Sequence, residues 1–208
     1  EEITAKDLLS KKVFWIISLA FAFQFLSMMG VLAFLPIHAS KMGLDETWNL
    51  LGLPVKQYVF SYSLAAFGGV IGKIIFGYLM DMMKAAQPPM IAMLLQAIGI
   101  FGITYLNEPN IFLLSAFIFG LGFGAATPLM TACYLRIFGA HNLGKARGMS
   151  SPIISPLQPI GILITSILIS FQETYFAAFN IMGCFALVAV ILASQIQEPE
   201  KIKPLINY

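Results

Sequence analysis

Charged residues are scarce in this sequence. Only 11% of its 208 residues are Asp, Glu, Lys or Arg, whereas 59% are hydrophobic. In soluble domains about a quarter of the residues are charged, so this composition excludes an ordinary water-soluble fold. The net charge is only +2, which argues against a basic surface for nucleic acid.

Cysteine is also nearly absent, with two residues in the chain. Cys133 and Cys184 both fall within apolar runs, where thiols usually serve as packing residues. A disulfide framework is therefore not indicated.

Long apolar runs fill the sequence instead. Six of them are close to the roughly 20 residues that a helix needs to cross a hydrocarbon core of about 30 Å. Barrel strands would be about half as long and would alternate apolar with polar residues. We therefore predict an all-α membrane protein, a six-transmembrane-helix bundle embedded in the lipid bilayer. The predicted spans are residues 13–37, 58–80, 90–106, 111–135, 148–170 and 175–196.

Basic residues favour one side of this bundle. Six spans place both termini on one side, together with nine of the twelve lysines and arginines, whereas Lys41 and Lys56 lie on the other. The positive-inside rule predicts cytoplasmic termini, in a plasma membrane or a bacterial inner membrane. Residues 1–12 are a predicted cytoplasmic linker, 13–196 the membrane domain and 197–208 a cytoplasmic tail. The start at Glu1, without a signal-peptide pattern, suggests a piece of a longer chain, although a processed terminus would look the same.

Histidine is as rare as cysteine, and this topology separates the two residues. His38 and His141 fall on opposite sides of the membrane, and no H-x-x-x-H, C-x-x-C, G-x-S-x-G or phosphate-loop pattern occurs. We therefore expect no metal site, no cofactor and no enzymatic activity.

Polar side chains are unevenly distributed among the spans. Spans one, two, four and five hold most of them, whereas the third and sixth offer little beyond Gln96 and Asn180. Because polar groups in lipid are costly unless they face protein or water, we predict that those four spans line a pathway and the other two face lipid. Alternatively, the Ser, Thr and Gly residues of these spans merely allow close helix packing. The pathway candidates are Gln24, Ser27, Lys73, Thr127, Thr131 and Gln158.

Three prolines distinguish the fifth span, within SSPIISPLQPIG (150–161). Each lacks an N–H and crowds the carbonyl four residues back, so this helix should bend. The bend is either a gate, with Pro156 and Pro159 as its candidates, or an ordinary kink. IGKIIFGYL (71–79) also aligns with IGILITSIL (160–168), as two three-helix inverted repeats would.

The end of the second span resembles a motif of the major facilitator superfamily. FGYLMD (76–81) is similar to the G-x-L-x-D opening of that family's loop motif, with Gly77, Leu79 and Asp81 in the matching positions. The usual basic cluster after Asp81 is reduced to Lys84. Further segments resemble the family's second half: FW (14–15), LPIHASKMG (35–43), YLRIFGAHNLGKARG (134–148) and PLQPIG (156–161).

This resemblance implies that the six spans correspond to helices seven to twelve, the C-terminal half of a transporter. It also implies a partner, the N-terminal six-helix half, and a pathway lined by helices seven, eight, ten and eleven. These are the same four spans that polarity selects.

Lys73, inside the second span, has three interpretations. It snorkels toward the headgroups, pairs with an acidic group of the other half, or binds an anionic substrate. Asp81 lies eight residues away, roughly 12 Å along the helix, so a pair within the helix is not expected. Within the superfamily, the chain most resembles monocarboxylate and oxalate-type carriers, which have a basic residue, generally arginine, four positions before the glycine that matches Gly77.

Two functions follow as hypotheses. The first is secondary transport of a small organic anion by alternating access, as a symporter or antiporter, with this chain as the C-terminal half. The second is a non-transporting six-span accessory protein in which Lys73 only snorkels.

Overall fold

The computed structural model describes residues 3–50, 52–106, 108–172 and 174–197. Within these ranges, six helical stretches are long and apolar enough to cross a membrane: Lys12–Leu32, Gln57–Met82, Gln87–Tyr105, Pro109–Phe138, Ala140–Phe171 and Phe176–Ser194. They confirm the predicted six-helix bundle and a multi-pass membrane protein.

The elements are α1 (Ala5–Ser10), α2 (Lys12–Leu32), α3 (Leu35–Lys41), β1 (Thr47–Leu50), β2 (Leu53–Lys56), α4 (Gln57–Met82), α5 (Gln87–Tyr105), α6 (Pro109–Gly124), α7 (Ala126–Phe138), the 3₁₀ turn η1 (Ala140–Asn142), α8 (Leu143–Ile154), α9 (Leu157–Gln172) and α10 (Phe176–Ser194).

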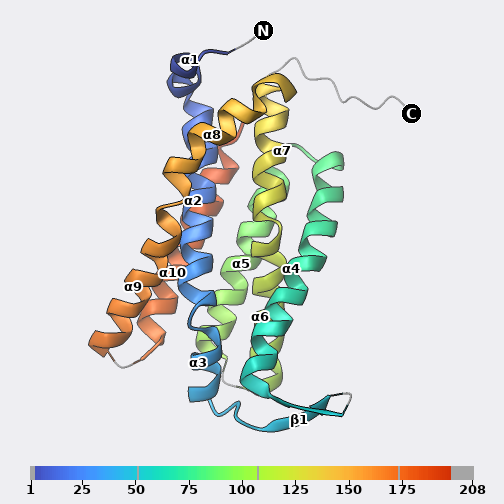
Figure 1. Cartoon of the computed structure of the whole chain (residues 1–208), viewed down its shortest axis with the longest axis vertical. Helices are drawn as coiled ribbons and strands as arrows, with labels where there is room; N and C mark the ends of the chain where they lie inside the picture. Colours follow the sequence, from blue (N-terminus) through green and yellow to red (C-terminus); the bar gives the residue numbers. More distant parts are fainter. Residues whose placement is uncertain (1–2, 51, 107, 173, 198–208) are drawn as a thin grey trace.

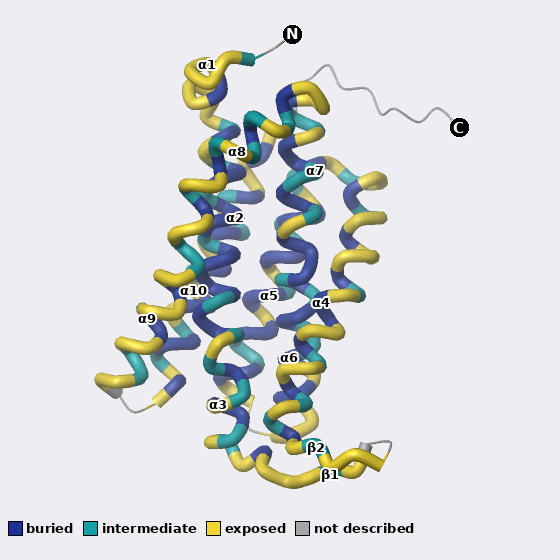
Figure 2. The backbone as a smooth tube through the Cα atoms, in the orientation of Figure 1, coloured by how far each residue is buried: buried dark blue, intermediate teal, exposed yellow. Residues whose placement is uncertain are grey.

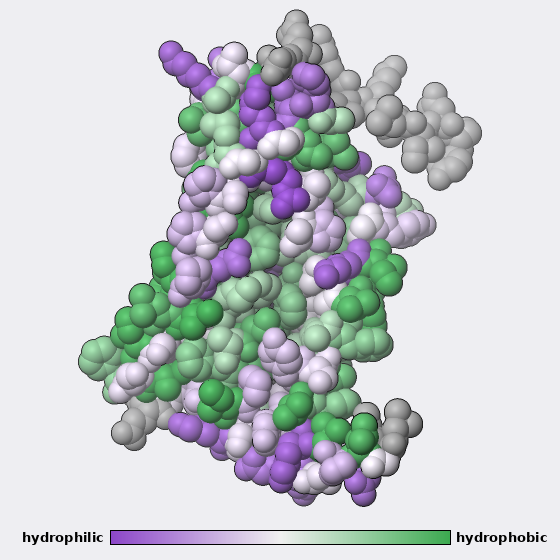
Figure 3. Space-filling view, viewed as in Figure 1, coloured by the Kyte–Doolittle hydropathy of each residue, from purple (hydrophilic) through white to green (hydrophobic). Residues whose placement is uncertain are grey.

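The helices pack as one bundle. α6 packs against α4 and α5, α10 packs against α5 and α2, and α2 also packs against α9. α9 and α4 lie at opposite edges of the view in Figure 1, with α1 at one end of the bundle and the β1–β2 hairpin at the other. Hydrophilic side chains gather at these two ends, and the middle of the visible face is largely apolar (Figure 3). This banding matches the polarity of a bilayer.

The first span is shorter than predicted. It was expected to reach Ile37, but α2 ends at Leu32, and the separate helix α3 begins at Leu35 with Pro36 in its first turn. A proline cannot donate to the carbonyl four residues back, but it fits the start of a new helix. The proline thus converts the end of one long apolar run into a break.

The fourth and fifth spans are each made of two helices. α6 ends at Gly124 and α7 begins at Ala126, while α8 ends at Ile154 and α9 begins at Leu157. Pro128 and Pro159 occupy the third position of the second helix in each pair, so neither can donate to the carbonyl four residues back, that of Gly124 or Ser155. The predicted bend of the fifth span is confirmed. The break in the fourth span was not predicted.

Glycines bring α4 and α6 into close contact. A Cβ on Gly72 would overlap with the backbone carbonyl of Leu121, and one on Gly68 with that of Phe117. On the facing helix, a Cβ on Gly120 would overlap with the carbonyl of Ala65. Such contacts between small residues replace the hydrophobic effect as the basis of helix association in lipid. These glycines therefore have the packing role that the sequence left as an alternative.

The third span is more enclosed than predicted. It was expected to face lipid, but 56% of the residues in its most apolar stretch are buried. The corresponding shares are 33% for the second span and 17% for the fifth. α5 packs between α6 and α10. In Figure 2, the tube of α5 is mostly dark blue, the colour of buried residues, whereas α4 and α9 show more of the yellow of exposed residues. The outward-facing surfaces are therefore largest on two of the spans that polarity assigned to the pathway.

A short hairpin connects α3 to α4. β1 and β2 pair antiparallel, with Thr47 opposite Lys56, and Gly52 has a φ of 83°, which glycine adopts without strain. The Trp48 ring lies 5.6 Å from that of Phe60. No strand was predicted in this connection, so the hairpin is an addition to the prediction.

Candidate functional site

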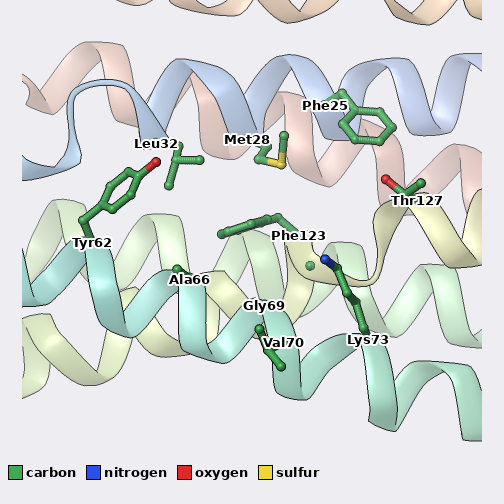
Figure 4. Close-up of a pocket in the computed structure, with 11 residues that line it drawn as sticks. Phe25, Met28, Leu32, Tyr62, Ala66, Gly69, Val70, Lys73, Phe123 and Thr127 are labelled. Atoms are coloured by element: carbon green, nitrogen blue, oxygen red, sulfur yellow. The ribbon is translucent and has the colours of Figure 1, made fainter.

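A hollow of about 340 Å³ opens between α2, α4 and the junction of α6 with α7. Figure 4 shows its lining, which includes Phe25 and Met28 from α2, Tyr62 and Lys73 from α4, and Thr127 from α7. Three of the four spans predicted to line a pathway contribute to it. The fifth span does not.

Lys73 places a cation in this hollow. Its side chain rises from α4 toward α2, and its nitrogen lies near Phe123 in the view of Figure 4. The residue is exposed, and within the described parts of the chain its ammonium group has no hydrogen-bond or ion-pair partner. Thr127, the other predicted pathway residue that lines the hollow, is also exposed.

The rest of the lining is mainly apolar. Phe25, Met28 and Leu32 face the hollow from α2, and Val70 and Phe123 face it from the other side. Apart from Lys73, the polar side chains in the lining are the hydroxyls of Tyr62 and Thr127. This arrangement suits a small molecule with an anionic group and an apolar body.

Thr131 lies one helical turn after Thr127 but does not line the hollow. Its hydroxyl donates to the Thr127 carbonyl at 2.9 Å and accepts a 2.7 Å hydrogen bond from Nη1 of Arg147. The half-buried Arg147 belongs to α8 and was counted in the sequence only as a charge at the cytoplasmic end. Its contact with a predicted pathway residue was missed because sequence spacing does not show which helices face each other.

Gln24 and Ser27 are in the interior and do not line this hollow. Both are fully buried. Nε2 of Gln96, on α5, donates to the Ser27 hydroxyl at 2.7 Å and to the Gln24 backbone carbonyl at 3.0 Å, and Nε2 of Gln24 donates to the Gly122 carbonyl at 3.3 Å. Polar groups at membrane depth find partners in neighbouring helices, and here these partners join α2, α5 and α6.

The candidates of the fifth span lie around the break between α8 and α9. Pro156 is in the break itself, between Ile154 and Leu157, and Pro159 is exposed in the first turn of α9. Gln158, half-buried beside it, does not line the hollow. The structure therefore separates these residues from Lys73, and their role as a gate stays a prediction.

The loop-motif residues lie in the last six residues of α4. Gly77 and Asp81 are exposed, Leu79 is half-buried, and no atom lies within 4 Å of the position of a Cβ on Gly77. Nη1 of Arg136, from α7, donates to the carbonyl of Met83 at 2.6 Å. The loop after the motif is thus held through its backbone by a cation from the fourth span.

Comparison with known proteins identifies one family. Residues 2–157 match the family model described as the Major Facilitator Superfamily, which is about three quarters of the chain. No curated protein sequence matches.

Solved structures of two transporters share the fold. The chain aligns with "the POT family transporter PepTSo" at a TM-score of 0.69 and 17% identity. It aligns with an "auto inhibited POT family peptide transporter" at a TM-score of 0.69 and 15% identity. Each alignment covers 88% of this chain and 36% of the other chain, so this chain spans little more than a third of the length of these transporters.

Proposed function

We propose, because this chain belongs to the Major Facilitator Superfamily, that it forms the C-terminal half of a secondary transporter and lines the path of a small organic anion. The observation that carries this proposal is the unpaired ammonium group of Lys73 in a hollow of about 340 Å³.

The cost of placing a cation at membrane depth supports an anionic substrate. A lysine at the centre of a membrane helix costs about 2.5–3.5 kcal/mol on insertion scales. Lys73 extends from α4 toward α2 across the hollow, and none of the described residues that line it is a carboxylate. A carboxylate of the substrate would compensate the charge while the substrate occupies the site.

The apolar lining supports an organic substrate rather than an inorganic ion. Phe25, Met28 and Phe123 offer apolar contact area near Lys73. Ligand pockets typically combine such a lining with a few polar groups that fix orientation. The volume of the hollow is near the lower end of the usual range of about 300–1,000 Å³, and the N-terminal half would supply the opposite wall.

The two interrupted spans support alternating access. Transporters built from repeats bind substrate at the repeat interface and rock one part against the other. The breaks at Ala125 and at Ser155–Pro156 are positions where the inner and outer parts of a span can change their angle.

Uptake by the complete carrier in proteoliposomes tests the proposal. The screen uses short carboxylates and, because the two similar structures are POT family transporters, short peptides. Lys73→Gln should abolish uptake of the transported anion without lowering the amount of carrier in the membrane. Lys73→Arg should retain part of it, because it keeps the charge but changes the geometry of recognition.

Lys6→Gln is the control, since it removes an exposed cation from α1, outside the six spans. Uptake should be unchanged in this variant. Normal uptake by Lys73→Gln would eliminate the binding role and leave snorkelling. Absence of uptake for every compound by a well-folded complete carrier would favour the accessory protein.

A further inference from the structure

A second hollow, of about 330 Å³, lies where α2 begins and α10 ends. It is lined by Lys12, Val13 and Ile16 on α2 and by Ser194, Gln195 and Gln197 at the end of α10. α2 packs along α10, so the hollow is a gap at one end of this helix pair. The proposed pathway between α2 and α4 does not include it.

The polar lining presents donors and a positive charge. Lys12, Gln195 and Gln197 are exposed, and in the described chain none of their side chains makes a hydrogen bond or ion pair. Ser194 already donates its hydroxyl proton to the carbonyl of Ile191 at 2.7 Å. The described residues that line the hollow include no carboxylate, so the site favours an anion.

Among the described residues, the ammonium group of Lys12 has no partner, unlike those of Lys11 and Lys145 at the same end of the bundle. The ammonium group of Lys11 lies 6.0 Å from the ring centre of Phe138, and that of Lys145 donates to the carbonyl of Ile3 at 2.8 Å. These two contacts help to hold the end of the bundle together. The charge of Lys12 is left available to a ligand.

The position of the hollow indicates a lipid rather than a soluble anion. Lys12 is the first residue of a membrane-spanning helix, and the half-buried Ile16 lies about 6 Å deeper along it. Trp15, whose indole N–H donates to the Leu9 carbonyl at 2.9 Å, is an exposed aromatic of the kind found at the membrane interface. A free phosphate would use the donors but leave the apolar contacts of Val13 and Ile16 unused.

We infer that this hollow binds the headgroup phosphate of an anionic phospholipid. The phosphate lies against Lys12 and the amide groups of Gln195 and Gln197, and the start of an acyl chain lies against Val13 and Ile16. Basic sites between helix ends at the membrane surface are known to bind acidic headgroups. A zwitterionic lipid gains less, because none of the described lining residues is a carboxylate that could receive its cationic group.

Native mass spectrometry of the complete carrier, purified in detergent, tests this assignment. Phosphatidylglycerol and phosphatidylcholine of equal chain length are added in turn, and the bound lipid is counted. The carrier should retain phosphatidylglycerol preferentially. Lys12→Gln should lower this retention about five-fold, as expected for the loss of one basic residue at a lipid surface.

Lys11→Gln is the matched control, because it removes an adjacent cation that contacts Phe138 instead of the hollow. It should leave the preference for phosphatidylglycerol unchanged. Equal losses in the two variants, or equal retention of both lipids, would overturn the inference. Displacement of the lipid by millimolar inorganic phosphate would identify a soluble-phosphate site. The readout requires no transport, so it is independent of the uptake assay.

Discussion

Nη1 of Arg147 donates a 2.7 Å hydrogen bond to the hydroxyl of Thr131, and this bond joins α8 to α7. α7 follows the break in the fourth span, and α8 precedes the break in the fifth. The helices on the same side of the two breaks are therefore connected by a charged hydrogen bond, and we expect them to move as one unit.

Replacement of Thr131 by valine should destabilise this connection. The variant removes the hydroxyl that accepts the bond and leaves the half-buried guanidinium of Arg147 without this partner. The free energy of unfolding should fall by about 1.5–3 kcal/mol, the contribution of a hydrogen bond to a charged group. Thermal unfolding of the purified carrier should show a lower midpoint. Thr127→Val is the control, because only the backbone carbonyl of Thr127 takes part in the connection. Equal midpoints for wild type and Thr131→Val would contradict the prediction.

Alanine at Gly72 should disrupt the contact between α4 and α6. Its Cβ would overlap with the Leu121 carbonyl, and overpacking of this kind costs about 1–3 kcal/mol. We expect a lower yield of folded carrier and a lower unfolding midpoint in detergent. Gly77→Ala, on the same helix, meets no atom within 4 Å and should behave like wild type. The prediction is wrong if the two variants are equally stable.

Removal of the prolines at the break in the fifth span should change the rate of transport. Alanine at Pro159 restores an N–H that can donate to the Ser155 carbonyl, so the helix gains continuity and the break loses freedom. In reconstituted carrier, Pro156→Ala and Pro159→Ala should change kcat more than KM. Pro152→Ala, within the continuous helix α8, is the control. A change confined to KM would count against a gate.

His38 should make stability depend on pH. It lies in α3, outside the six spanning stretches, against the rings of Tyr175 and Phe179, with Nε2 3.2 Å from the carbonyl of Ile103. Burial lowers the pKa of His38, the bond with Ile103 opposes this shift, and Lys41 adds to it. Folding therefore favours the neutral ring. The stability that this provides is present above the usual pKa near 6.5 and is lost as the pH falls from there toward the folded pKa.

Thermal unfolding from pH 8 to pH 5 measures this effect. The midpoint of the wild type should fall on acidification, and His38→Gln should fall less. His141→Gln removes an exposed histidine and should retain the full dependence. If His38→Gln kept the same pH dependence as wild type, another group would be responsible.

The number of spans could be predicted because each requires a long apolar run, and hydrocarbon tolerates few alternatives. Their ends were harder to predict, since the first helix ends at Leu32 instead of Ile37. The bend of the fifth span followed from its prolines. Pro128 has the equivalent position in the fourth span, the third residue of α7, but no break was predicted there. The position of a proline within a helix, rather than the number of prolines in a span, therefore marks the breaks in these two spans.

The orientation of side chains around each helix was harder to predict. Gln24 was a predicted pathway residue and Gln96 lay in a span predicted to face lipid. The sequence did not show that the Gln96 side chain would donate to the Gln24 carbonyl. Spans that are apolar on all sides give no periodic signal of the inner face. Lys73 was easier to interpret because an unpaired charge in a span is costly wherever it faces.

The β1–β2 hairpin, at the end of the bundle opposite α1, is a suitable place to determine the orientation of the protein in the membrane. A Cβ on Gly52 would have no atom within 4 Å, and the two strands form the only sheet among the described residues. An epitope inserted in this turn would extend away from the helices (Figure 1). Antibody access to it in intact cells would then report which compartment the turn faces.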